Sequence, residues 1–326
     1  MLRHILGCLA AVSVLSLCAQ AADDQGIQRL DPALDKLLPK DAKVEKLGGN
    51  LLFTEGPVWD RRAGYLLFSD VPGNAIMKWT TDGKVSVFRK DIFTGYYPAG
   101  FPIGPNGTTI DPQGRLVFCE HGNRRISRLE KNGSLTVLAD RYEGKRLNSP
   151  NDIVSTKSGD IYFTDPPYGL FSSNPPDPEK DHKQELDFAG IFRIRAGKLE
   201  VMVKIQNPNG LAFTPDGKKI YLSQGSDWVI YDVKPDGTFG SGRVFYQQKE
   251  KGGPDGFKVD KAGNVWSSSG PKGISIISPQ GKLLGVIAFP EEPANCAFGD
   301  ADGKSLYVTA RAGLYRIRTN IQGLRP

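Results

Sequence analysis

A short sequence pattern occurs six times along this chain of 326 residues. In each copy a polar residue or glycine opens a short apolar run, and a glycine follows eight positions after that first residue. The copies begin at Gly56, Asn106, Asn151, Asn209, Asp255 and Asn295, so their starts lie 50, 45, 58, 46 and 40 residues apart. Periods in this range are typical of stacked or radial units of four strands. The sequence therefore predicts six repeated units that close into a ring.

Each unit has the pattern of a β-hairpin, because the second glycine leads into another apolar run, as in RLVFCE (115–120) and SLYVTA (305–310). Third and fourth strands follow in several units. We predict an all-β fold, a six-bladed β-propeller with four-stranded blades, in one domain spanning residues 43–326. The sixth unit supplies only about three strands, so a strand near Lys43 to Lys46 should complete it and remove the exposed edges. Residues 22–42 would wrap outside the ring.

The first 21 residues have the features of a secretory signal peptide. Arg3 and His4 precede an apolar stretch from Ile5 to Leu17, and Ala19-Gln20-Ala21 forms a small-x-small cleavage pattern. A buried first helix would need a cap and a polar face, and a lipid anchor on Cys18 would need a small residue in place of Leu17. No later apolar run reaches the length of about 18 residues that spans a bilayer. We expect a periplasmic or secreted protein that has no membrane segment after cleavage.

The mature chain keeps two cysteines, Cys119 and Cys296. They fall on different strands of distant repeats, which makes a bond between them geometrically doubtful and favours two buried thiols. The formal net charge is +6, but Lys and Arg are scattered along the chain without an aromatic-interleaved basic stripe. Nucleic-acid binding is therefore not indicated, and the charge is that of an ordinary solvated surface.

Two sets of loops should share one mouth of the central channel. In a blade, the hairpin brings the end of the second strand back beside the start of the first. Residues before the repeat starts and after the second strands therefore converge. The long connections 166–188 and 91–105, the second with Tyr96, Tyr97 and Phe101, should overhang this mouth as lid or specificity segments. A plain disordered insertion at 166–188 stays an alternative.

The side chains at this mouth are oxygen donors, namely Glu55, Asn106, Asn151, Asn209, Asp255 and Asn295. Two carboxylates with several amide carbonyls suit a hard divalent cation such as Ca²⁺. Zinc or iron is less suited, because the mature chain holds only His121 and His182. Asn and Asp before Gly also form ordinary turns. Pro-Asp-Gly occurs at 215–217 and 235–237 as well, and only the position of Asp255 at a repeat start separates it from those turns.

Five segments in order carry a family resemblance: TEGPVW (54–59), NSPNDIV (148–154), IYFTDPPYGL (161–170), NGLAFTPDG (209–217) and GGPDGFKVD (252–260). With these the chain resembles the gluconolactonase and senescence-marker-protein-30 (SMP-30/regucalcin-like) family of calcium-dependent six-bladed propeller lactonases, from about residue 50 to 318. The resemblance implies metal ligands at Glu55, Asn151, Asn209 and Asp255. It also implies a substrate-side or water-mediated contact for Asn106 and a structural role for Asn295.

The resemblance implies a metal-dependent hydrolase that opens a sugar lactone, its small-molecule partner, to the aldonic acid. Four protein ligands leave open positions on a cation that prefers six to eight, so a substrate carbonyl could bind there and become electrophilic. By the same resemblance Asp255 acts in proton transfer. Ca²⁺ is favoured, with Zn²⁺, Mg²⁺ and Mn²⁺ left open, and the oligomeric state is not determined by the sequence.

Three further residues are candidates at the mouth. His121 has an ordinary pKa suited to acid–base work at neutral pH, although it could equally cap the loop EHGNRR. Arg124 and Tyr168 could bind sugar hydroxyls or the new carboxylate, although exposed arginines are usually only solvated. Two other functions stay open: hydrolysis of an organophosphate or aryl ester on the same metal site, and a non-catalytic propeller that serves as a binding platform.

Overall fold

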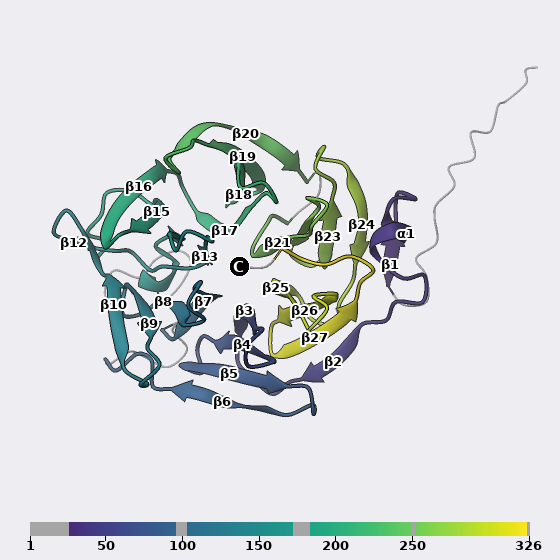
Figure 1. Ribbon diagram of the computed structural model, residues 1–326, viewed down its shortest axis with the longest axis horizontal. Helices are drawn as coiled ribbons and strands as arrows, with labels where there is room; N and C mark the ends of the chain where they lie inside the picture. The colour runs from purple at the N-terminus through teal and green to yellow at the C-terminus, as the bar shows by residue number, and fades with distance from the viewer. Residues whose placement is uncertain (1–25, 96–102, 172–182, 249–251, 325–326) are drawn as a thin grey trace, which may run out of the picture.

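The computed structural model describes residues 26–95, 103–171, 183–248 and 252–324. Six antiparallel sheets stand around a central channel, which confirms the predicted six-bladed propeller (Figure 1). Consecutive blades follow one another around the ring, with the innermost strand of each lining the channel. Among the described residues no helix is long and apolar enough to cross a membrane.

The first three blades each hold four strands in chain order from the channel outward. Blade 1 consists of β3 (Thr54–Asp60), β4 (Tyr65–Asp70), β5 (Ala75–Thr80) and β6 (Val85–Lys90). Blade 2 consists of β7 (Pro105–Ile110), β8 (Leu116–Glu120), β9 (Arg125–Leu129) and β10 (Leu135–Ala139), followed by the small hairpin β11 (Arg141–Tyr142) and β12 (Lys145–Arg146). Blade 3 consists of β13 (Ile153–Ser155), β14 (Ile161–Asp165), β15 (Gly190–Arg195) and β16 (Lys198–Lys204), with the 3₁₀ helix η1 (Tyr168–Leu170) after β14.

The last three blades differ because the N-terminal region joins two of them. Blade 4 consists of β17 (Pro208–Phe213), β18 (Lys219–Gln224), β19 (Asp227–Val233) and β20 (Phe239–Gln247). Blade 5 consists of β21 (Phe257–Val259), β22 (Val265–Ser268), β23 (Ile274–Ile277), β24 (Leu283–Ile287) and an added fifth strand, β1 (Ile27–Arg29). Blade 6 consists of β25 (Pro293–Gly299), β26 (Ser305–Ala310), β27 (Gly313–Arg318) and β2 (Glu45–Gly48).

The ring closes by the pairing of β2 with β27, in which Glu45 lies opposite Arg316 and Lys46 opposite Tyr315. The predicted closing strand is therefore confirmed, two residues further along the chain than expected. The sequence reasoning missed β1, which covers the outer edge of blade 5, and the short helix α1 (Leu34–Leu37) beside it. Leu34 and Leu37 are buried in the apolar core that joins blades 5 and 6.

Apolar side chains fill the space between neighbouring blades. Trp59 of blade 1 stacks on Tyr307 of blade 6 with ring centroids 5.5 Å apart, and this contact packs the first blade against the last. Cys119 and Cys296 are buried free thiols, as predicted. Because every blade buries both faces against its neighbours, the six sheets cannot shift independently.

In several blades the innermost strand is irregular where the pattern begins. The pairing register shifts between Glu55 and Val58 in blade 1, between Pro105 and Thr108 in blade 2, and between Pro208 and Leu211 in blade 4. A bulge of this kind bends the strand and re-aims its side chains. Glu55, Asn106 and Asn209 therefore lie at bulges at the mouth of the channel.

Hydrogen bonds between blades fix the backbone at these bulges. The amide of Gly107 donates to the carbonyl of Asn151 in the next blade at 2.6 Å, and the amide of Gly210 donates to the carbonyl of Asp255 at 3.1 Å. A Cβ on Gly107 would lie 2.5 Å from the Asn151 oxygen, and one on Gly210 would lie 2.3 Å from the Asp255 oxygen. The repeated glycine is therefore needed for close approach of the neighbouring blade.

Serine hydroxyls on the second strands reinforce this contact. Ser69 Oγ donates to the Asn106 carbonyl at 2.6 Å, and Ser223 Oγ donates to the Asp255 carbonyl at 2.8 Å. At Asn106 and Asp255, the backbone carbonyl thus accepts a hydrogen bond from the preceding blade. The side-chain oxygens, which are the candidate donors at the mouth, are not used in these bonds.

We expect Gly107→Ala to lower the free energy of unfolding by about 1–3 kcal/mol, because the added methyl group would force blades 2 and 3 apart. Gly240→Ala is the matched control, since a Cβ there would meet its nearest neighbour at an ordinary 3.5 Å. Urea unfolding followed by fluorescence measures both. Equal stability of the two variants would contradict a tight contact at the channel.

Candidate functional site

The predicted donors lie around one mouth of the channel. Glu55, Asn106 and Asn209 belong to the innermost strands of blades 1, 2 and 4, whereas Asn151 and Asp255 directly precede those of blades 3 and 5. Glu55, Asn106 and Asn151 are 4, 6 and 7 % exposed, so they are held inside the channel, and Asn209 and Asp255 are half-buried.

Two carboxylates from blades 1 and 5 lie close enough to affect each other. Burial raises the pKa of Glu55 to about 7, against the hydrogen bond that the Gly56 amide donates to its Oε2 at 2.7 Å. Burial also raises the pKa of Asp255 well above its usual value, and the negative charges of Glu55 and Asp152 add to this effect. A hydrogen bond from Asn209 opposes it. The mouth therefore concentrates negative charge that the surrounding protein only partly compensates.

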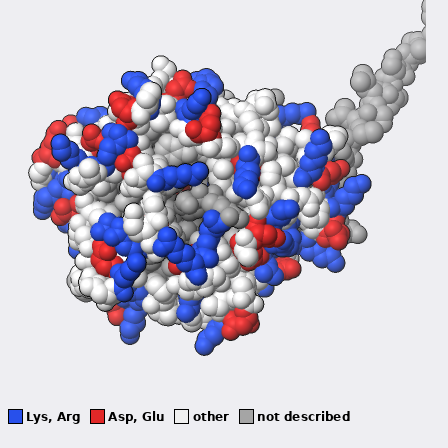
Figure 2. All heavy atoms as spheres, in the orientation of Figure 1, with Lys and Arg blue, Asp and Glu red and all other residues white. Residues whose placement is uncertain are grey.

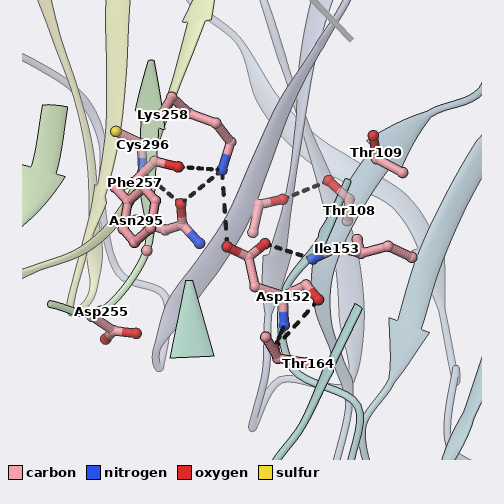
Figure 3. Close-up of polar contacts among 12 residues, drawn as sticks. Thr108, Thr109, Asp152, Ile153, Thr164, Asp255, Phe257, Lys258, Asn295 and Cys296 are labelled. Atoms are coloured by element: carbon pink, nitrogen blue, oxygen red, sulfur yellow. Dashed lines mark hydrogen bonds and ion pairs between the residues drawn. The ribbon is translucent and has the colours of Figure 1, made fainter. Parts of the chain in front are cut away.

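A third carboxylate and a lysine belong to the same cluster, and the sequence reasoning did not identify them. Figure 3 shows the Lys258 ammonium of β21 reaching toward Asp152, with 4.0 Å between Nζ and Oδ2. The ammonium also donates to the carbonyl of Phe257 at 3.1 Å. The sequence did distinguish Asp152 from its equivalents. It occupies the second position of its repeat, where three other repeats have a glycine, namely Gly107, Gly210 and Gly256.

Asn295 connects the lysine to Glu55. Its Oδ1 accepts from Lys258 Nζ at 3.4 Å and from the Cys296 amide at 2.8 Å, and its Nδ2 donates to Glu55 Oε2 at 3.1 Å (Figure 3). With these contacts Asn295 orients the Glu55 carboxylate. The structural role that the family resemblance implies agrees with this arrangement.

The charges and the free lone pairs at the mouth fit a hard divalent cation. The cluster holds three carboxylates, those of Glu55, Asp152 and Asp255, and one ammonium, that of Lys258, so with all three carboxylates ionised two negative charges are in excess. In the described part of the chain, Asn106 Oδ1 and Asp152 Oδ2 are buried without a hydrogen-bond partner. Carboxylate and amide oxygens are ligands that Ca²⁺ prefers. The described residues contain no cluster of three His, Cys, Asp or Glu with metal-binding geometry, so amide oxygens would have to complete any such site.

Tyr168 lies near the acid pair. It opens η1, directly after β14, and is half-buried. Burial raises the pKa of its hydroxyl, and the charge of Asp255 raises it further. The hydroxyl is therefore protonated at neutral pH and available as a donor at the mouth.

His121 is buried beneath the loop that carries Asn151. Its Nδ1 lies 3.0 Å from the carbonyl of Pro150, which can only accept, so Nδ1 carries the hydrogen. Burial lowers the pKa of His121 to about 4, so the ring is neutral at neutral pH. A Cβ on Gly169 would lie 2.5 Å from Nε2, so the ring packs directly against η1. The imidazole thus holds the loop at Pro150 and the helix η1 in place. A catalytic role for His121 stays a prediction.

Arg124 has a structural setting as well. It adopts a positive φ of 60°, and its side chain is only 4 % exposed. Its Nε donates to the carbonyl of Leu147 at 2.6 Å, and its Nη1 lies 3.5 Å from Glu185. The guanidinium therefore joins blade 2 to segments of blade 3, and the predicted substrate contact is not tested by this arrangement.

The long connections reach the same mouth by their described ends. The amides of His121 and Gly122 donate to the carbonyls of Gly104 and Ile103 at 3.1 Å each. At the other connection, Leu186 is buried in the core of blades 2 and 3. The predicted aromatic residues Tyr96, Tyr97 and Phe101, and also His182 and the signal peptide, lie outside the described residues.

The fold and this site together define a six-bladed β-propeller with an acidic, oxygen-rich centre at one mouth of its channel. The chain belongs to the SMP-30/gluconolactonase/LRE-like family, whose conserved region matches residues 53–312. It is 35 % identical to a gluconolactonase of Zymomonas mobilis over 98 % of this chain and 95 % of that protein. It is 28 % identical to a pentonolactonase of Haloferax volcanii over 79 % of this chain and 81 % of the other. A solved gluconolactonase from Xanthomonas campestris is 35 % identical and superposes with a TM-score of 0.80 over 90 % of this chain and 94 % of that one.

We expect Lys258→Met to destabilise the protein by about 1–3 kcal/mol, because it leaves the buried Asp152 carboxylate without a counter-charge. Asp152→Asn in the same chain should recover part of that loss. Urea unfolding in chelator, with Lys131→Met as the exposed control, measures the coupling. Additive effects of the two substitutions would show that Lys258 and Asp152 do not interact.

The low pKa of His121 predicts a pH dependence of stability. The folded ring, with a pKa of about 4, binds its proton less readily than the unfolded ring, whose pKa is near 6.5. Its contribution is therefore complete above pH 6.5 and is lost as the pH falls toward 4. Between pH 7.5 and 5 the wild type should lose about 2 kcal/mol that His121→Asn does not lose. Parallel pH profiles of the two proteins, measured by urea unfolding, would contradict a buried neutral imidazole.

Proposed function

We propose that this protein is a lactone hydrolase that opens a sugar lactone to the aldonic acid at the acidic mouth. Two observations support the proposal. The carboxylates of Glu55 and Asp255 come from separate blades, burial raises the pKa of both, and the charge of Glu55 raises the pKa of Asp255 further. The relative from Zymomonas mobilis that matches nearly the whole chain is a gluconolactonase. Residues 1–21 would direct export, which makes the enzyme periplasmic or secreted.

Glu55, Asn151, Asn209 and Asp255 would hold one divalent cation, with Ca²⁺ favoured by the all-oxygen donor set. A cation bound there supplies a Lewis acid for the lactone carbonyl and neutralises the two excess negative charges. Asn295 and Lys258 contribute by orienting Glu55 and by compensating Asp152. The neutral His121 keeps the backbone before Asn151 in place through the Pro150 carbonyl.

Asp255 would move the proton in the reaction. Water adds to the carbonyl carbon, the bond between that carbon and the ring oxygen breaks, and the ring oxygen leaves as a hydroxyl. Asp255 accepts the proton from the attacking water and returns it to the ring oxygen, so its own protonation state is restored. The new carboxylic acid then releases a proton to solvent. Tyr168, which lies close to Asp255, and Asn106, with its unpartnered Oδ1, would bind the sugar hydroxyls.

Acid release from gluconolactone and from five-carbon sugar lactones, followed with a pH indicator, tests the function. Asp255→Asn should lower kcat at least about 100-fold, because it removes the proton acceptor. Asp216→Asn is the matched control, since Asp216 occupies another Pro-Asp-Gly segment and only closes a turn with Thr214 and Lys218. Turnover by Asp255→Asn at the wild-type rate would contradict the assigned role. Hydrolysis of a phosphotriester or aryl ester with none of any lactone would replace the proposed substrate.

Metal removal gives an independent prediction. Dialysis against a chelator should abolish turnover, and added Ca²⁺ should restore it and raise the Tm. At a concentration 100 times its Kd, a cation that binds only the folded state adds about 2.7 kcal/mol of stability. Glu55→Gln should weaken Ca²⁺ binding, measured by calorimetry, at least about tenfold. Activity and Tm that do not respond to chelator would exclude the cation.

A further inference from the structure

A cavity of about 1160 Å³ occupies the end of the channel opposite the acidic mouth. It is lined by the inner ends of the first strands, including Val58, Ile153 and Leu211, and by the hairpin turns that follow them. Glu55, Asn151, Asn209 and Asp255 are not among its lining residues, so this space is separate from the proposed lactone site.

The rim of this cavity is strongly basic. Its lining includes seven Lys or Arg residues and three Asp residues. Figure 2 shows Lys and Arg side chains gathered around the centre of one face of the ring. Two of the three lining carboxylates pair with arginine, Asp160 with Arg195 at 2.5 Å and Asp300 with Arg318 at 3.1 Å, and the third, Asp216, accepts hydrogen bonds within its own turn. The basic charge is therefore in excess.

Several of the rim cations are exposed and form no ion pair with a carboxylate of the described residues, among them Arg61 and Lys157. Both follow first strands, in blades 1 and 3, and both line the one cavity. A cavity with apolar walls and an excess of one sign of charge concentrates small counter-ions.

Lys258 lies at the inner end of the same cavity. It is the lysine that contacts Asp152 and Asn295, so one side chain borders both the cavity and the acidic cluster. Apolar side chains line the wall between this ammonium and the basic rim, among them Val58, Leu211 and Ala297. Cationic ends and an apolar wall suit a small organic molecule that carries carboxylate groups.

We propose that this far end of the channel is a second binding site, for a small organic carboxylate that pairs with Arg61 and Lys157 at the rim and approaches Lys258 inside. The aldonate released by lactone hydrolysis is one such molecule, and this assignment of the ligand rests on the proposed function. The acidic mouth repels an anion once it has formed, whereas the far end attracts it. Binding at the far end would then act on the acidic cluster through Lys258.

Calorimetric titration of gluconate into chelator-treated protein at low ionic strength tests the site without any turnover. Arg61→Glu/Lys157→Glu reverses the rim charge and should raise the Kd for gluconate at least about tenfold, since two attractions become repulsions. Lys84→Glu/Lys131→Glu makes the same charge change on exposed turns outside the cavity and should leave the Kd within about twofold. An unchanged Kd in the rim variant overturns the proposal. Inorganic phosphate that binds as tightly, with equal loss in the rim variant, overturns the organic-carboxylate assignment.

Steady-state rates with Ca²⁺ present provide a second readout. Gluconate at the far end should lower the apparent kcat of the wild type and should lose that effect in the rim variant, while kcat/KM without gluconate stays unchanged. Inhibition that is purely competitive in both proteins overturns coupling between the two ends. If no lactone is hydrolysed, the proposed function fails, but the calorimetric result still decides whether the second site exists.

Discussion

The arrangement of the site depends on hydrogen bonds between neighbouring blades at the mouth of the channel. The Gly107 and Gly210 amides and the Ser69 and Ser223 hydroxyls bind carbonyls of donor residues in the following blade. An oxygen-donor residue whose carbonyl is bound in this way has little backbone freedom. Little conformational entropy is therefore lost when its side chain binds a ligand in the channel. A set of oxygen donors drawn from separate blades can therefore be rigid although no two are close in sequence.

Charge is the second constraint on the site. Burying Glu55, Asp152 and Asp255 together is unfavourable unless positive charge is supplied, because desolvation and mutual repulsion act in the same direction. The Lys258 ammonium provides one unit inside the protein. The raised pKa values of Glu55 and Asp255 reflect what is left uncompensated, and a divalent cation is the simplest group that would neutralise it. A site with uncompensated negative charge of this kind is suited to bind a cation tightly.

The two ends of the channel have opposite electrostatic character. One end gathers carboxylates and amide oxygens, and the other is bordered by lysine and arginine. The Lys258–Asp152 ion pair lies between the acidic end and the basic end of the channel. A neutral lactone entering at the acidic end and an anionic product would respond differently to this polarity. The propeller thus offers two chemically different surfaces on one axis, which loops on a single face could not provide.

The repeat alone determined the number of blades, the position of the innermost strands and the shared mouth, because spacing of 40–58 residues between like segments leaves few alternatives. It also predicted that the oxygen donors at the repeat starts would lie at that mouth, whereas the choice of Glu55, Asn151, Asn209 and Asp255 as metal ligands came from the family resemblance and stays a prediction. The roles of Asp152 and Lys258 depend on contacts between blades 3 and 5, which are remote in sequence, and only the tertiary structure brings them within 4.0 Å. His121 shows the same limit, since its ordinary pKa suited acid–base work, and burial against Pro150 and Gly169 decided that the ring is neutral. The local sequence pattern indicates the position of a residue within its repeat. The burial of a side chain and its ion pairs with residues of other blades depend on the assembled ring.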